Sequence, residues 1–316
     1  MNIYPLVMEP SFRSGPETPW GGTALKEKFG KNTPEEATGE SLEISALPGH
    51  ESRAANGELR GCTLQEIFLL WGSRMTGTEG KTFPLLLKLL DARQALSVQV
   101  HPDDAYALAH EGKRGKTEAW YILGAEPGAK LVFGTDTRGE PLRSVVEDGR
   151  LESCLRWVDA RPGDVFYIPS GTIHALGPGI QCYEIQESSD VTYRFWDWGR
   201  TGKDGRPREL HTEKALAVSN TGPVPGQVSP AGRPVPGGLS TLLADDPHFQ
   251  LYAADLDGTF STDAGRMQFL TPTVPCTVSW DTSELALAPY RSMLIPADMG
   301  PVRLSGRGRV LISRIP

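Results

Sequence analysis

One stretch in the middle of the chain decides the fold: Gly163-Asp164-Val165-Phe166-Tyr167-Ile168-Pro169-Ser170-Gly171-Thr172-Ile173-His174. Its apolar and aromatic first half predicts a short strand over residues 164–168. Pro169 and Gly171 predict a tight turn, because proline fixes φ and glycine accepts backbone angles that other residues avoid. His174 then begins a return strand. The stretch therefore predicts two strands joined by a turn, with a histidine directed into the space that they enclose.

The fixed residues of this stretch have the spacing of a known motif. The pattern G-x5-P-x-G-x2-H matches the second motif of cupin barrels at every fixed position. The first cupin motif, His-x-His followed shortly by Glu, occurs in modified form: Gln99 replaces the first histidine, His101 is the second, and a lengthened gap precedes Glu118. We therefore expect an all-β-dominated protein whose catalytic domain is a cupin jelly-roll β-barrel with a few helices.

Short strands separated by turns agree with a barrel. Glycine and proline, at 35 and 26 of 316 residues, disfavour a mostly helical protein. The clearest helix begins at Thr63, which forms a capping-box pair with Glu66, and another is expected over residues 208–219. Strands are predicted over residues 84–90, 96–101, 118–123, 130–134, 181–186 and 192–196.

A stretch rich in Gly, Pro and Val, residues 220–238, predicts a linker or exposed loop and the boundary between two domains. Residues 1–222 are expected to form the catalytic cupin domain with N-terminal strands and helical insertions. Residues 223–316 are expected to form a second, smaller β domain of degenerate cupin-like type.

Four side chains from distant segments are candidate metal ligands. Side chains alternate along a strand, so Gln99 and His101 share one face of a Val-rich strand and need polar partners if that face is buried. A half-exposed strand is the alternative, and a surface ion pair of Lys116 and Glu118 is another. With His174, the set offers two nitrogens and two oxygens, which favours a divalent first-row ion. Zinc is the commonest such ion, and iron(II) in an oxygenase is the alternative.

Composition excludes some partners. The formal charge of −7 disfavours a nucleic-acid binder, whereas one phosphorylated metabolite needs only a local cluster of Arg and Lys. The N-terminus lacks the pattern of a signal peptide, and no apolar stretch has the length of a membrane span. We expect a cytoplasmic protein without membrane partners. The remaining histidines are assigned no role: His50, His110, His211 and His248.

At these residues the chain resembles a family. Gln99-Val100-His101-Pro102-Asp103-Asp104, Lys116-Thr117-Glu118 and the segment 168–175 look like type I mannose-6-phosphate isomerase. The segment 185–200, Ile-Gln-Glu-Ser-Ser-Asp-Val-Thr-Tyr-Arg-Phe-Trp-Asp-Trp-Gly-Arg, is similar to its short bacterial branch. The resemblance covers residues 20–220 well and the C-terminal third loosely.

The resemblance implies a cupin enzyme that interconverts mannose 6-phosphate and fructose 6-phosphate through a cis-enediol. It implies one zinc ion per chain, held by Gln99, His101, Glu118 and His174. It also implies that Arg194 is catalytic or binds substrate. Further residues are implied to line the sugar-phosphate site: Ser97, Lys116, Glu184 and Arg200. Sequence leaves the oligomeric state open between monomer and homodimer.

The residues suggest roles within such a site. Glu184, on a strand soon after His174, is our candidate for the base, and Lys116 is the second choice for proton transfer. Arg194 and Arg200 are six residues apart on a strand-like run, so alternation predicts that both face inward and bind phosphate. Two alternatives share these residues. One is a non-catalytic sugar-binding cupin, and the other is an iron-dependent cupin oxygenase.

Overall fold

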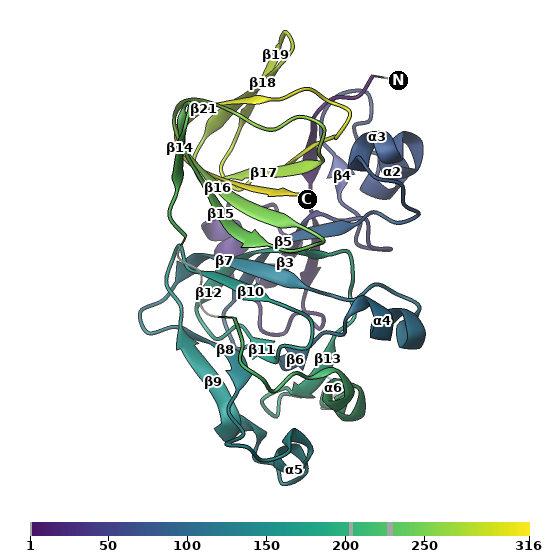
Figure 1. The fold of residues 1–316 in the computed structure, drawn as a ribbon, viewed down its shortest axis with the longest axis vertical. Helices are drawn as coiled ribbons and strands as arrows, with labels where there is room; N and C mark the ends of the chain where they lie inside the picture. The colour runs from purple at the N-terminus through teal and green to yellow at the C-terminus, as the bar shows by residue number, and fades with distance from the viewer. Residues whose placement is uncertain (1, 202–204, 226–229) are drawn as a thin grey trace.

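The computed structural model describes residues 2–201, 205–225 and 230–316, and three antiparallel β-sheets stack in it as layers (Figure 1). The middle layer is a six-stranded sheet in the order β10 (Val165–Ile168), β7 (Glu118–Ala125), β12 (Ile180–Glu187), β5 (Leu85–Ala92), β3 (Thr38–Ile44) and β2 (Ser11–Ser14). On one side lies a five-stranded sheet in the order β13 (Tyr193–Trp196), β6 (Val98–Val100), β11 (His174–Ala175), β8 (Lys130–Thr135) and β9 (Leu155–Asp159).

The third sheet has ten strands and lies on the other side of the middle layer (Figure 1). Its main path is β14 (Arg233–Val235), β15 (Gly238–Asp245), β16 (Gln250–Ser261), β21 (Arg303–Arg314), β17 (Gln268–Pro272), β20 (Met293–Ile295), β1 (Leu6–Glu9) and β4 (Arg53–Ala54). A side branch adds β18 (Cys276–Trp280) and β19 (Ser283–Leu287).

The six-stranded and five-stranded sheets pack around one apolar core, which confirms the predicted cupin-type fold. Leu90, Trp120 and Cys182 of the six-stranded sheet pack in one cluster with Leu131 and Phe133 of the five-stranded sheet. The opposite face of the six-stranded sheet is covered as well, by the C-terminal sheet. All eight residues of β5 are therefore buried, which explains its nearly continuous apolar sequence.

The two ends of the chain meet in the C-terminal sheet. Leu6 and Val7 pair with Leu294 and Met293, so the N-terminus contributes β1 to a sheet built mostly from C-terminal strands. The division into residues 1–222 and 223–316, and the cupin-like character of the second part, stay predictions. Of the predicted linker 220–238, residues 226–229 lie outside the described residues and Arg233–Val235 forms β14.

Helices are few and short, as predicted. Thr63 caps α2 (Leu64–Trp71) with both hydrogen bonds of the capping box, and Asp103 caps α4 (Asp104–Glu111). The helix expected over residues 208–219 is confirmed but shorter, as α6 (Thr212–Val218). The others are α1 (Ala24–Glu27), α3 (Ser73–Thr76), α5 (Leu142–Glu147) and the 3-10 helix η1 (Leu151–Cys154).

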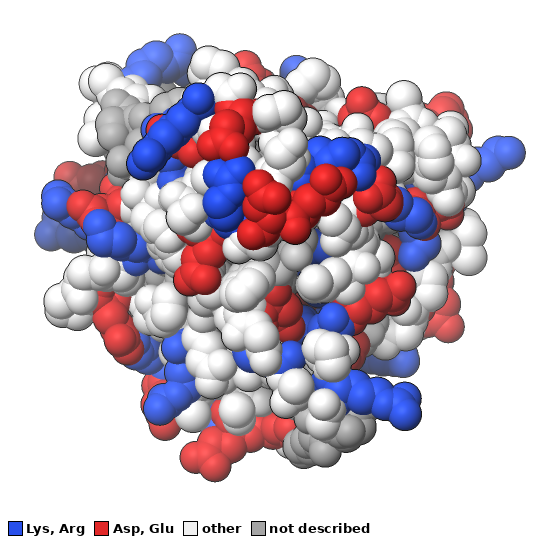
Figure 2. All heavy atoms as spheres, turned by 90° about the horizontal axis from the view of Figure 1, so that it is seen from below, with Lys and Arg blue, Asp and Glu red and all other residues white. Residues whose placement is uncertain are grey.

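The surface carries charges of both signs. In the face shown in Figure 2, Lys and Arg side chains are interspersed with Asp and Glu side chains. An anion-binding site on that face would therefore be a local feature. Among the described residues, no helix is long and apolar enough to cross a membrane.

Candidate active site

The four predicted metal ligands meet between the two sheets of the barrel. Gln99 lies in β6 and pairs directly with His174, the first residue of β11. His101 follows the end of β6, and Glu118 is the first residue of β7 on the facing sheet. His101, Glu118 and His174 each contribute a ligand atom to a group in which these atoms all lie within 4.8 Å of one another.

Backbone carbonyls orient both imidazoles. Nδ1 of His101 lies 2.9 Å from the carbonyl oxygen of Val191, and Nδ1 of His174 lies 2.8 Å from that of Thr172. Each Nδ1–H therefore donates to a carbonyl, which leaves the lone pair of Nε2 directed at the Glu118 carboxylate. The Nε2–oxygen distances to Glu118 are 3.7 Å for His101 and 3.2 Å for His174.

These facing atoms fit a metal ion. Two unprotonated ring nitrogens and a carboxylate are all acceptors, so they repel unless a proton or cation lies between them. In the described part of the chain, Nε2 of His101 and Oε1 of Glu118 are buried without a hydrogen-bond partner. Burial lowers the pKa of His174 to about 4, so this imidazole is neutral at pH 7 and can bind a metal. Burial lowers the pKa of His101 as well.

Gln99 completes the set. Its Nε2 lies 3.5 Å from Nε2 of His174, and its Oε1 accepts a hydrogen bond of 3.4 Å from the Ser97 hydroxyl. Rotation of the amide by 180° would direct its oxygen toward the imidazoles. The set then offers two nitrogens and two oxygens, and imidazole and carboxylate are ligands that zinc accepts.

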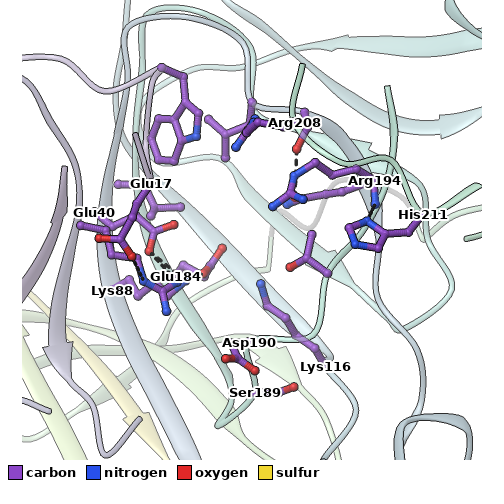
Figure 3. A pocket seen from close by; sticks show the side chains of 17 residues that line it. Glu17, Glu40, Lys88, Lys116, Glu184, Ser189, Asp190, Arg194, Arg208 and His211 are labelled. Atoms are coloured by element: carbon purple, nitrogen blue, oxygen red, sulfur yellow. Dashed lines mark hydrogen bonds and ion pairs between the residues drawn. The ribbon is translucent and has the colours of Figure 1, made fainter. Parts of the chain in front are cut away.

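A cavity of about 400 Å³ opens beside this cluster (Figure 3). It holds cations and anions together, with five Arg or Lys side chains and four carboxylates in its lining. The lining residues are Arg13, Glu17, Trp20, Glu40, Lys88, Leu90, Leu96, Ser97, Gln99, Lys116, Glu184, Ser189, Asp190, Thr192, Arg194, Arg208 and His211. The structure thus brings together at this cavity five predicted site residues, namely Ser97, Gln99, Lys116, Glu184 and Arg194.

Arg200 is not among the residues that line this cavity. Its guanidinium donates to the carbonyl of Ala95 at 2.7 Å and pairs with Asp197, next to a neighbouring hollow. The alternation argument that paired it with Arg194 is wrong, because β13 ends at Trp196 and Trp198 adopts a positive φ of 58°. Arg208, which also pairs with Asp197, lines the cavity instead. A role of Arg200 in binding substrate stays a prediction.

The side chain of Lys116 extends into the cavity (Figure 3). Its Nζ lies 2.9 Å from Oε2 of Glu118. Burial alone would lower the pKa of Lys116, but the charges of Glu118 and Glu184 raise it above its ordinary value. Burial raises the pKa of Glu118 to about 7, although Lys116 opposes this. At neutral pH Lys116 is therefore a cation and a hydrogen-bond donor.

Glu184 lies on the opposite side of the cavity from Arg194 in Figure 3. Its Oε2 accepts a hydrogen bond of 2.8 Å from Nε1 of Trp120, and its Oε1 lies 3.5 Å from Nζ of Lys88. Burial alone would raise the pKa of Glu184, but Lys116, Lys88 and the Trp120 hydrogen bond together hold it below the ordinary value. Glu184 is therefore an ionised carboxylate at neutral pH.

The structure adds residues that sequence reasoning missed. Lys88 is 6% exposed and pairs with Glu40 at 3.3 Å as well as with Glu184. A lysine within the apolar run of β5 was the available signal, since a buried lysine needs carboxylate partners. His211, which was assigned no role, lines the cavity and accepts a hydrogen bond of 3.3 Å from the backbone N–H of Arg194.

Known proteins are similar to this chain in sequence and in fold. Residues 13–119 match the family described as phosphomannose isomerase type I, catalytic domain. A mannose-6-phosphate isomerase of Streptococcus mutans is 42% identical over 241 residues, which are 76% of this chain and 76% of that protein. The crystal structure of the mannose 6-phosphate isomerase from Bacillus subtilis matches with a TM-score of 0.91 at 34% identity, covering 98% of this chain and 99% of that one.

A third protein shares the fold at lower identity. It is a mannose 6-phosphate isomerase whose crystal structure is described as the zinc-bound holo form, with a TM-score of 0.77 and 18% identity. The identity and coverage of the bacterial relatives go beyond a shared fold. The chain therefore belongs to the type I phosphomannose isomerase family, and the protein is an isomerase.

Proposed function

We propose that the protein interconverts mannose 6-phosphate and fructose 6-phosphate through a cis-enediol, with one zinc ion per chain. The observation that carries the proposal is the buried group of His101, Glu118 and His174, whose unsatisfied acceptor atoms lie beside a cavity with several cationic side chains. The names of the bacterial relatives support mannose 6-phosphate as a substrate.

Gln99, His101, Glu118 and His174 would hold the zinc ion. Bound there, zinc supplies redox-inert Lewis acidity to the oxygens of the sugar. The two backbone carbonyls that accept from the Nδ1 atoms keep the imidazoles in the tautomer that a metal requires. With the neutral amide of Gln99 as a fourth ligand, the metal would have fewer open coordination positions than in a facial triad, which has only three protein ligands.

Glu184 is the proposed base of the isomerisation. As an ionised carboxylate it takes the proton from C2 of the open-chain aldose, which leaves a cis-enediolate. A proton on O1 makes this the cis-enediol, O2 gives up its proton in exchange, and Glu184 returns the carbon-bound proton to C1, so the aldose becomes the ketose. Trp120 and Lys88 keep the two oxygens of Glu184 in place. Lys116, protonated at neutral pH, donates a hydrogen bond to the oxygen on which charge develops. Lys116 as the proton-transferring group itself stays the second choice.

Arg194 is the proposed partner of the substrate's phosphate. Its Nε is buried without a hydrogen-bond partner in the described part of the chain, and its Nη1 makes a contact of 3.4 Å with the Glu209 carbonyl. Burial and the nearby charge of Arg208 lower the pKa of Arg194. A phosphate dianion between the two guanidiniums would relieve this repulsion and accept from both.

Two experiments test the proposed function: removal and restoration of the metal, and substitution of the proposed base. We expect purified protein to contain zinc, to lose turnover of mannose 6-phosphate when zinc is chelated, and to regain it anaerobically when zinc is restored. Recovery only with iron(II) and oxygen would contradict the isomerase and support the oxygenase. Zinc binding without turnover under any condition would support the non-catalytic sugar-binding cupin.

Glu184→Gln separates the base from the metal site. We expect this variant to retain zinc and to lose turnover, because the amide cannot accept the proton. Near-normal activity would reject Glu184 as the base. The matched control is Glu213→Gln, which removes an exposed carboxylate that pairs with Arg143 and is not among the residues that line the cavity. The cytoplasmic location and the monomeric or homodimeric state stay predictions.

A further inference from the structure

A second cluster of metal-binding side chains lies at the junction of the C-terminal sheet and the catalytic part. Asp104 begins α4, Glu187 ends β12, and His248 lies in the turn between β15 and β16. One ligand atom from each lies within 4.8 Å of the other two. Nε2 of His248 is 3.5 Å from Oε2 of Glu187 and 3.7 Å from Oδ2 of Asp104.

The other polar atoms of these side chains are already occupied. Nδ1 of His248 lies 2.9 Å from Oδ1 of Asp246 and donates to it. Oε1 of Glu187 accepts from the backbone N–H of Thr117 at 2.9 Å, and Oδ1 of Asp104 accepts from that of Gly115 at 2.7 Å. Each side chain is therefore fixed with its remaining atom, Nε2, Oε2 or Oδ2, directed at the centre of the cluster.

Asp246 is itself held in place, because its Oδ2 accepts a hydrogen bond of 2.6 Å from the Tyr167 hydroxyl. A carboxylate that accepts from Nδ1 of a histidine is the usual support of a histidine metal ligand. It fixes the tautomer and leaves the lone pair of Nε2 free. The arrangement around His248 is thus of the same kind as that of the two histidines in the barrel.

Glu187 gives independent evidence that the cluster needs a cation. Its side chain is 2% exposed, and its Oε2 has no hydrogen-bond partner among the described residues. The carboxylates of Asp104 and Asp246 lie on either side of His248, so three carboxylates surround one imidazole. A buried, unpartnered carboxylate oxygen is costly unless a cation compensates it.

We propose that Asp104, Glu187 and His248 bind a second divalent first-row metal ion, such as manganese or zinc. Two carboxylate oxygens and one imidazole nitrogen suit such an ion better than calcium or magnesium. Asp104 is exposed and His248 is partly exposed, so the ion can enter from solvent and complete its coordination with water. The ion ties the β15–β16 turn to α4 and β12 and thereby stabilises the junction between the two parts.

Manganese binding to the zinc-loaded protein tests the site, because free Mn²⁺ has an EPR signal that is lost on binding. We expect the wild type to bind one Mn²⁺ per chain in addition to its zinc, with zinc content measured in the same samples. His248→Ala and Asp104→Asn should each weaken Mn²⁺ binding at least about tenfold, since even a supporting residue of a metal ligand is worth about 10–100-fold. Mn²⁺ should raise the Tm of the wild type and not that of His248→Ala.

His110→Ala is the matched control. It removes an exposed histidine from the same helix as Asp104 and should bind Mn²⁺ as the wild type does. The proposal is overturned if the wild type binds no Mn²⁺ beyond its zinc, in which case the cluster is an ion pair of charged His248 with its carboxylates. It is equally overturned if both His248→Ala and Asp104→Asn bind Mn²⁺ with wild-type affinity.

Discussion

Two carboxylates in this protein are equally buried but have different hydrogen-bonding neighbours. Glu43 in β3 and Glu118 in β7 are both 0% exposed, and each pairs with a buried lysine. Nζ of Lys31 lies 2.5 Å from Glu43, and Nζ of Lys116 lies 2.9 Å from Glu118. What differs is whether the remaining partners donate hydrogen bonds or accept them.

Around Glu43 every further partner is a donor. The Ser41 hydroxyl donates to Oε1 at 2.6 Å, and the Ser292 hydroxyl donates to Oε2 at 3.0 Å. Around Glu118 the further partners are two imidazole Nε2 atoms that can only accept, given their Nδ1 bonds. A satisfied network fixes the structure, whereas facing acceptors need a cation between them. The comparison thus separates a structural ion pair from a metal site.

The largest effect of a substitution is expected at Glu118, where hydrogen-bond acceptors face one another. Glu118→Gln should abolish zinc binding and lower kcat/KM by at least about 10³-fold, because loss of a mere supporting residue already costs about 10–100-fold. Zinc content after dialysis and the isomerase rate check this. If Glu118→Gln kept both zinc and activity, Glu118 would not be a metal ligand, and the distinction between the structural ion pair at Glu43 and the metal site at Glu118 would be wrong.

The same isosteric change at Glu43 should affect stability instead. Glu43→Gln leaves Lys31 buried opposite a neutral amide, which should cost about 3–5 kcal/mol of unfolding free energy. Urea denaturation of the variant and the wild type measures it, with zinc content unchanged in both. A loss of zinc, or a cost under about 1 kcal/mol, would mean that the two carboxylates do not differ as described.

Protons should compete with the metal ion for the carboxylate of Glu118, which makes metal binding depend on pH. In the metal-free protein burial raises the pKa of Glu118 from 4.5 to about 7, so a proton must leave when the metal binds. The folded metal-free protein holds more protons than the unfolded chain between these values, so this group makes stability fall as pH rises from 4.5 to 7. Metal affinity changes in the opposite direction.

We expect the zinc association constant to fall about tenfold per pH unit below pH 7, as one proton requires. His174, whose pKa is about 4, should add to the effect only near that pH. Competition with a chelator at several pH values measures the slope. A constant that does not change between pH 7 and pH 5 would contradict the raised pKa of Glu118.

The smallest effect is expected from one hydrogen bond of the satisfied network. Ser292→Ala removes the hydrogen-bond donor to Oε2 of Glu43. It should lower the free energy of unfolding by about 1–3 kcal/mol, the cost of leaving a buried acceptor without a hydrogen bond. Ser153→Ala, which removes an exposed hydroxyl, is the control and should change stability by less. Thermal unfolding compares the two; equal Tm values would show that the Ser292 hydrogen bond is not needed.

Sequence predicted the barrel because its signals are local. The turn at Pro169 and Gly171, the cap at Thr63 and the alternation in β6 each depend on neighbouring residues only, and the structure has all three. The four candidate metal ligands were predicted because two fixed motifs carry them, and the structure brings three of them, His101, Glu118 and His174, into one group. Gln99 and His174 are paired residues in neighbouring strands, as a barrel requires.

The rest depends on contacts between distant segments. Arg200 was expected to continue the alternation of Arg194, but the strand ends first and Arg208, from a later loop, lines the cavity. Lys88 looked like an interruption of an apolar run, since its partners Glu40 and Glu184 lie on two other strands. The partners of His248 likewise come from α4 and the end of β12, which no local pattern connects.

The most direct measurement of the central claim is an anomalous difference map at the zinc absorption edge, from crystals grown with zinc. The account predicts a strong peak between Nε2 of His101, Nε2 of His174 and the carboxylate of Glu118, and loss of that peak in Glu118→Gln. A fully loaded, active protein whose zinc peak lies anywhere else would contradict it.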